Sequence, residues 1–193
     1  MLPIMKSKKT LHFYLSFVFM AIVVSCSGGG SSIYPDNHTL TNETISSKSS
    51  GLTMRAPQGW FSAEENENKI IDAWLIKENY SASLSLVPLN FDEQIKKTYD
   101  IDNLAEVLNI SKLFKKAETG LSYKETGETE FFKLNSKNFA AYQFTGKNSK
   151  KIRVVVFRYA DQYYEFSAIP AEGKSISEQE LFGVQNSVLA SIK

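Results

Sequence analysis

The sequence predicts an α+β domain, a mostly antiparallel sheet with helices packed on both faces. Three observations support this class. Strand-like segments follow one another at hairpin-length spacing in the second half of the chain, at 130–134, 139–146, 152–160 and 163–169. The segment 152–160 is apolar on both faces, which indicates a central strand covered on both sides. Two amphipathic helices, one in mid-chain and one near residue 193, can supply the covering layers.

The first strands are expected in the residues that follow 51. Segment 52–56 reads as a short strand that ends at Pro57, and Pro57 with Gly59 predicts a turn. Trp60 follows this turn, and we expect its large apolar ring to anchor the core. Segments 70–77 and 82–89 predict a hairpin. In the second of these, leucine and serine alternate, as in a strand with one face in water.

Both helices show recognisable boundaries. Asp102 is a suitable N-cap for a helix that extends to about Glu118, and residues 119–129 are polar and predict a loop. Ser177 and Glu180 form a capping box at the start of the last helix. The lysines in the last turns of the first helix could form a binding patch, but we expect a solvated helix end that complements the dipole; they are Lys112, Lys115 and Lys116.

The hairpin of 152–160 and 163–169 carries a specific register prediction. With Asp161-Gln162 as a two-residue turn, Arg158 lies opposite Glu165. This register places opposite charges side by side and pairs aromatic residues across the strands. We expect Arg158 and Glu165 to form a structural pair without a catalytic role.

The first fifty residues indicate export and lipid anchoring. A short basic start and an apolar run over 11–24 predict a signal peptide over 1–25, since a membrane-spanning helix needs about 20 apolar residues. Val23-Val24-Ser25-Cys26 resembles the bacterial lipobox, so we expect Cys26 to be lipidated and to hold the chain in the membrane. Ser27 is not the aspartate that retains enteric lipoproteins at the inner membrane, which favours the outer membrane, facing the periplasm.

Three regions are therefore expected: the lipoprotein signal peptide 1–25, a flexible tether 26–50, and a folded domain 51–193. The tether is rich in Gly, Ser, Thr and Asn and poor in apolar residues. A flexible chain of that length would hold the domain roughly 25–30 Å from the bilayer.

Composition argues against several kinds of chemistry. Without the three lysines of the first 25 residues, 19 basic residues face 21 acidic ones, so the mature chain has no electrostatic footprint for nucleic acid. Its one histidine, His38, falls in the expected tether, and Cys26 is the only cysteine. A Ser-His-Asp or Cys-His site and a His/Cys zinc site are thus excluded from the domain. We predict no catalytic residue, no metal ligand and no cofactor.

Two kinds of residue cluster leave alternatives open. Carboxylates gather in two predicted loops and could bind a cation or act as acid and base, although solvated charges are the expectation; they are Glu64, Glu65 and Glu67, and Glu125, Glu128 and Glu130. Tyrosines gather on neighbouring strands, either as sheet packing, which we favour, or as the lining of a binding cleft; they are Tyr142, Tyr159, Tyr163 and Tyr164.

The order of these elements, the Pro57-x-Gly59-Trp60 turn and the helix end at 186–192 resemble the PsbP-like and DcrB-like family of α/β/α sandwiches. The resemblance covers 51–193 and implies a domain that binds or supports other proteins, with no common catalytic site. We therefore expect a lipid-anchored, non-catalytic binding or assembly module of the bacterial cell envelope. The alternative is a carboxylate-dependent hydrolase or metal-binding enzyme built on the acidic loops.

Overall fold

The computed structural model describes residues 30–63 and 70–193. The predicted signal peptide 1–25, Cys26, and the acidic residues Glu64, Glu65 and Glu67 lie outside the described residues. Within the described ranges, no helix is both long and apolar enough to cross a bilayer.

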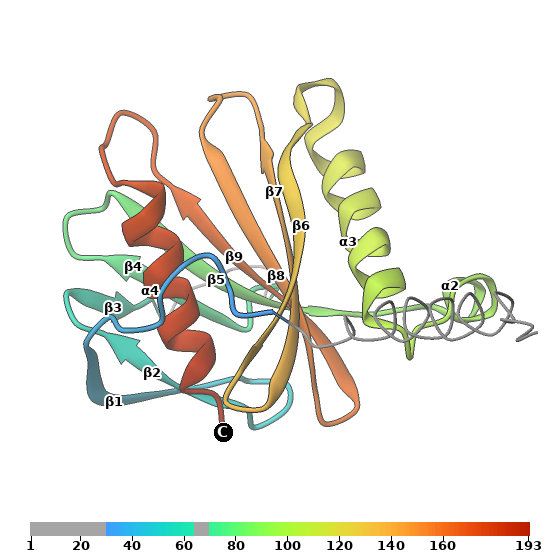
Figure 1. The fold of residues 1–193 in the computed structure, drawn as a ribbon, viewed down its shortest axis with the longest axis horizontal. Coiled ribbons are helices and arrows are strands. Elements are labelled where there is room, and N and C mark those ends of the chain that lie inside the picture. The colour runs from blue at the N-terminus through green and yellow to red at the C-terminus, as the bar shows by residue number, and fades with distance from the viewer. Residues whose placement is uncertain (1–29, 64–69) are drawn as a thin grey trace, which may run out of the picture.

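A seven-stranded sheet forms the centre of the fold (Figure 1). All of its neighbouring strands pair antiparallel. In spatial order the strands are β3 (Trp60–Ser62), β4 (Ala73–Lys77), β5 (Ala82–Leu89), β9 (Gln162–Pro170), β8 (Lys151–Tyr159), β7 (Lys137–Thr145) and β6 (Lys124–Leu134). Helices α3 (Leu104–Thr119) and α4 (Glu178–Ala190) lie on opposite sides of it. The predicted α+β class is confirmed.

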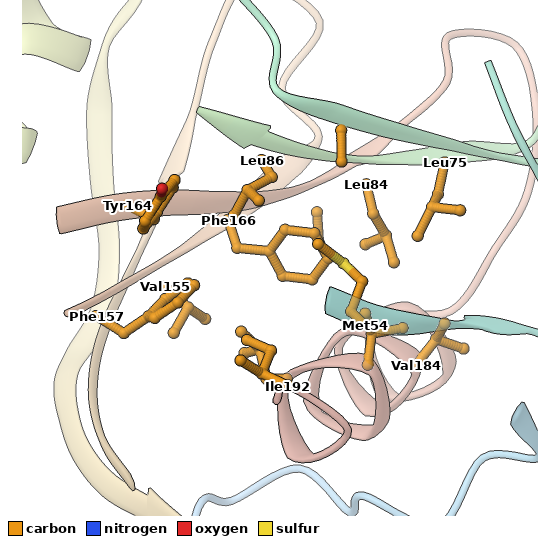
Figure 2. Packing of buried hydrophobic residues seen from close by; sticks show 14 of the residues in the cluster. Met54, Leu75, Leu84, Leu86, Val155, Phe157, Tyr164, Phe166, Val184 and Ile192 are labelled. Carbon is orange, nitrogen blue, oxygen red and sulfur yellow. The ribbon is translucent and has the colours of Figure 1, made fainter. Parts of the chain in front are cut away.

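The larger core lies between the sheet and α4. A separate antiparallel pair, β1 (Leu40–Ser46) and β2 (Thr53–Pro57), helps α4 to cover this face. Figure 2 shows Met54 of β2 and Val184 of α4 directed toward Leu84 and Phe166 of the sheet. Burial of these large apolar side chains is the main source of stability on this side.

The smaller core lies between the sheet and α3. Val107 and Leu108 of the helix meet Val154 and Val156 of β8, all at most 1% exposed. Val155 and Phe157 of the same strand belong to the core on the other face. The two-sided pattern of 152–160 therefore reflects a central strand covered by both helices, as predicted.

The helix starts differ in one detail from the prediction. Asn103, one residue after the expected Asp102, caps α3 by accepting a 2.9 Å hydrogen bond from the backbone N–H of Ala105. Ser177 caps α4 through a 3.1 Å bond from the N–H of Glu180, as predicted. A short helix, α2 (Glu93–Thr98), precedes α3, and a 3-10 turn, η1 (Gly120–Ser122), follows it.

The described part of the predicted tether is folded. Residues 40–46 form β1, and the following turn is held by the buried carboxylate of Asp72. That carboxylate accepts hydrogen bonds from the N–H of Lys48 at 3.0 Å and from Ser49 Oγ at 2.9 Å. The tether prediction is thus wrong over these residues, because their serines and threonines find partners in the domain instead of water.

The predicted loop at 119–129 is also wrong in part. Strand β6 begins at Lys124, and a bulge between Thr126 and Glu130 lets its polar first half continue into the apolar second half. Both glycines of this stretch have positive φ, Gly120 at 64° and Gly127 at 74°, so they mark turns and irregularities and not a long loop.

The β8–β9 hairpin exists, but its register differs from the prediction. Tyr159 pairs with Gln162, so the turn residues are Ala160 and Asp161, with Ala160 in the left-handed region at φ 51°. Arg158 consequently pairs with Tyr163, and Glu165 pairs with Val156. Since this shift spans an even number of residues, every side chain keeps its predicted face, although the Arg158–Glu165 pair is lost.

Candidate functional site

Helix α3 covers only part of its side of the sheet, because it packs mainly on β7 and β8. The register places Trp74, Ser85 and Ser167 in line with Val154, so all four share the face that α3 covers at β8. Toward β3 the side chains on this face become more exposed, and Phe61 is 36% exposed. A groove forms where the helix stops covering the sheet.

This α3 groove encloses about 620 Å³. Its floor is made by β5 and β9, one wall by α3, and its rim by the chain before β4. The lining side chains include Ser85 and Val87 of β5, Glu165, Ser167 and Ile169 of β9, Phe114, Lys115 and Glu118 of α3, and Ile70 of the rim. A second hollow of about 490 Å³ shares Lys115, Glu118, Ser167 and Ile169 with it. The two hollows therefore meet at Lys115.

A hydrogen-bonded network lies below the groove. Glu165 is 2% exposed and accepts a 2.5 Å hydrogen bond from Ser111 Oγ. The hydroxyl of Tyr142 lies 2.9 Å from the same Ser111 oxygen. The second carboxylate oxygen of Glu165 pairs with Lys115 Nζ at 3.2 Å, and Lys115 also pairs with Glu118 at 3.1 Å. Each polar group of this network thus has a partner.

Two groups of this network, Lys115 and Tyr142, have raised pKa values. Burial lowers the pKa of Lys115, but the combined attraction of Glu165 and Glu118 outweighs it, so the pKa is raised and the amine stays charged. Burial, followed by the Glu165 charge, raises the pKa of the Tyr142 phenol far above its usual range. The phenol therefore remains neutral and can donate to Ser111.

The polar groups below the groove are occupied by contacts with one another. Ser111 is 0% exposed and its hydroxyl donates to Glu165, so a substrate in the groove does not reach this oxygen. Both carboxylate oxygens of Glu165 have partners, Ser111 on one and Lys115 on the other. The groove exposes apolar surface at Phe114, which is 38% exposed, and at Ile70, which is 61% exposed, beside the exposed carboxylate of Glu118. An apolar ligand or protein segment fits this surface.

The predicted structural residues are distributed over the fold. Pro57 ends β2, Gly59 turns the chain at φ 78°, and Trp60 is 5% exposed in the core on the α4 side. Arg158 lies at the surface and pairs with Asp102 at 3.2 Å. Glu165 alone of the predicted residues lies in the groove, where it contacts α3.

The acidic residues of β6 do not form a common site. Glu125 pairs with Lys112 of α3, whereas Glu130 pairs with the buried Arg153 at 3.2 Å. Glu128 is exposed. Across residues 30–63 and 70–193, no group of three His, Cys, Asp or Glu side chains is placed to hold a metal ion.

The tyrosines pack in the cores and do not line one cleft. Tyr142 and Tyr163 belong to the core on the α3 side, and Tyr164 belongs to the core on the α4 side. Tyr159 is partly buried against the latter. This division follows from the alternation of side chains along neighbouring strands.

Sequence reasoning missed the part that α3 plays in the network. Lys115 was expected in water at a helix end, but it is paired with a buried carboxylate. A signal was present, because Val107, Ser111 and Lys115 recur at intervals of four and so share one helix face. Polar residues in an otherwise apolar stripe indicate a buried partner on the opposing element.

Comparisons with known proteins add information on the fold. No family model and no curated protein matches the sequence. Among solved structures, the cyanobacterial PsbP protein of Synechocystis, CyanoP, is similar with a TM-score of 0.56 and 10% identity, covering 78% of this chain and 91% of CyanoP. A protein of Bacteroides thetaiotaomicron gives a TM-score of 0.34 at 11% identity, covering 74% of this chain and 44% of that one. The likeness to CyanoP shows that the chain has a PsbP-like fold.

Proposed function

We propose that this protein is a lipid-anchored, non-catalytic binding or assembly module for other proteins of the bacterial cell envelope. The observation that carries the proposal is the α3 groove. Its lining includes two exposed apolar side chains, Phe114 and Ile70, while Glu165 below it is paired with Lys115. Such a surface can gain free energy by covering this apolar area.

The anchor of this module is Cys26. Its support is the sequence, namely a basic start, the apolar run 11–24 and Val23-Val24-Ser25-Cys26. Ser27 in the next position favours the outer membrane, on its periplasmic side. Mass spectrometry of the native protein would detect a diacylated, N-terminal Cys26, and an unmodified thiol there would contradict the anchor.

The enzymatic alternative gains no support from the described acidic residues. Glu125 and Glu130 are each paired with a cationic side chain, and the buried carboxylates of Asp72 and Glu165 line different hollows. Asp72 holds the turn after β1, whereas Glu165 lies under the α3 groove.

The test compares two neighbouring residues of α3. Phe114 lines the groove and Leu113 does not, although Leu113 is 51% exposed. Tagged full-length protein carrying Phe114→Glu or Leu113→Glu is isolated from chemically cross-linked envelopes. We expect Leu113→Glu to retain the cross-linked partner found with the wild type, and Phe114→Glu to lose it. Equal recovery with both variants would contradict a binding role for the groove.

A further inference from the structure

The segment that follows the proposed anchor is fastened to the domain from its first described residue. The carbonyl of Gly30 accepts a 3.3 Å hydrogen bond from the N–H of Lys133, and Gly30 forms a parallel bridge with Phe132 at the edge strand β6. The chain then crosses α4 toward β1 (Figure 1). The backbone N–H of His38 donates a 2.9 Å bond to Ser187 of α4.

Buried polar groups hold the middle of this segment. Ser32 Oγ accepts a 2.9 Å hydrogen bond from the side-chain amide of Asn186, which also donates to the Tyr34 carbonyl at 2.8 Å. Arg153, 0% exposed, lies with its guanidinium 5.1 Å from the centre of the Tyr34 ring. Because Asn186 is also fully buried, releasing the segment would leave these donors without partners.

The length of chain between anchor and domain is therefore short. Three residues, Ser27, Gly28 and Gly29, separate Cys26 from Gly30. Four fully extended residue steps span at most about 14 Å. The headgroup layer of one leaflet takes up about 5–8 Å of that reach. A lipid on Cys26 thus leaves at most about 6–9 Å between the headgroup surface and the Gly30 end of the domain, less than the width of a folded protein.

Exposed apolar side chains occur close to this end. Ile33, three residues after Gly30, is 68% exposed, and Phe131, next to the Gly30–Phe132 bridge, is 48% exposed. Lys133 is exposed as well and carries the charge that anionic headgroups attract. Aromatic, aliphatic and basic side chains together are typical of surfaces that contact the membrane interface.

We infer that the domain rests directly on the bilayer that holds its lipid, with Ile33, Phe131 and Lys133 against the headgroups. This inference rests on the proposed lipidation of Cys26. The membrane is the occupant because the proposed lipid on Cys26 lies only four residue steps from Gly30, too close for a folded partner to fit between. In consequence, the orientation of the α3 groove relative to the membrane is restricted and not random.

The test uses the full-length lipidated protein in vesicles of phosphatidylethanolamine and phosphatidylglycerol. One cysteine is introduced at a time, as Ile33→Cys, Phe131→Cys or Tyr80→Cys, and labelled with a fluorophore; acylated Cys26 does not react. Tyr80 is the matched control, since it is 64% exposed and lies in the turn between β4 and β5. Three strands, β9, β8 and β7, separate these two strands from β6 in the sheet. Headgroup-spin-labelled lipid then serves as the quencher.

We expect the labels at residues 33 and 131 to lose most of their fluorescence, and the label at residue 80 to keep it. Equal quenching at all three positions, in protein shown by mass spectrometry to be lipidated, would overturn the inference and leave the anchor intact. A second outcome would also overturn it: labels at residues 33 and 131 that are shielded from solvent in native envelopes but are not quenched in vesicles that hold no other protein. That result would assign the surface to a protein partner. An unmodified Cys26 would overturn the anchor and the inference together.

Discussion

Ser111 of α3 donates a 2.5 Å hydrogen bond to Glu165 of β9, joining two residues 54 positions apart in the chain. With Lys115 at 3.2 Å on the other carboxylate oxygen, this contact ties the helix to the centre of the sheet. The position of the groove wall therefore depends on a polar contact as well as on apolar packing.

Glu165→Gln is expected to destabilise the protein by about 1–3 kcal/mol. The change removes the negative charge that balances Lys115 and puts a buried amide in place of the carboxylate. Urea unfolding followed by circular dichroism would measure the loss. Glu118→Gln is the control: its side chain is 71% exposed and also pairs with Lys115, so a much smaller effect is expected. Equal losses would show that burial of Glu165 does not matter.

Tyr142→Phe should change how stability depends on alkaline pH. The folded protein raises the pKa of this phenol, so its contribution is complete below the unfolded value near 10 and is lost as the pH rises beyond it. The wild-type free energy of unfolding should thus fall above about pH 10 by up to ~1.4 kcal/mol more per pH unit than that of the variant. Denaturant titrations at a series of pH values test this, and parallel curves above pH 10 would contradict it.

Arg153→Ala should cost about 3–5 kcal/mol, the range for removing one partner of a buried ion pair. The change leaves Glu130 without its cation and removes the 2.8 and 2.9 Å bonds to Gln185 and Asn186. Amide hydrogen exchange should also accelerate over 31–38, the segment that contacts Arg153. Arg158→Ala, a surface control, should leave both stability and exchange close to those of the wild type.

Trp60→Ala is expected to cost about 3–5 kcal/mol, as large aromatic truncations in cores do. Trp60 is 5% exposed, whereas its neighbour Phe61 is 36% exposed and points to the opposite face. Thermal melting should therefore show a large shift for Trp60→Ala and a small one for Phe61→Ala. Trp60→Phe should be intermediate, since the indole N–H it removes is buried without a partner in the described structure.

The sequence predicted what depends on local periodicity. The two-sided pattern of β8 and the capping box at Ser177 identified a central strand and a helix start, because each is determined by neighbouring residues. The fold class followed from the order of such elements. The same reasoning placed Glu165 on the correct face of β9, since the later shift of register preserved the alternation.

What the sequence did not reveal depends on contacts between distant segments. Residues 40–46 look like a linker by composition, and only β2 and the carboxylate of Asp72 make them a folded part of the domain. The hairpin register depends on Ala160, which adopts a positive φ. Positive φ is uncommon outside glycine, asparagine and aspartate, so an alanine gave no sign of this turn in the sequence. The groove likewise arises from how far α3 extends over the sheet, a property of tertiary packing.

The contact between the first described residues and α4 also determines when this segment can fold onto the domain. Ser32 and Asn186 are 154 positions apart, yet they are joined by a hydrogen bond. Contacts of such high sequence separation require closure of nearly the whole chain and form slowly. If the chain is exported from its N-terminus, as we propose, residues 30–38 leave the membrane before α4 and can dock only once α4 has followed. Under that proposal, the domain is completed only after α4 has been translocated.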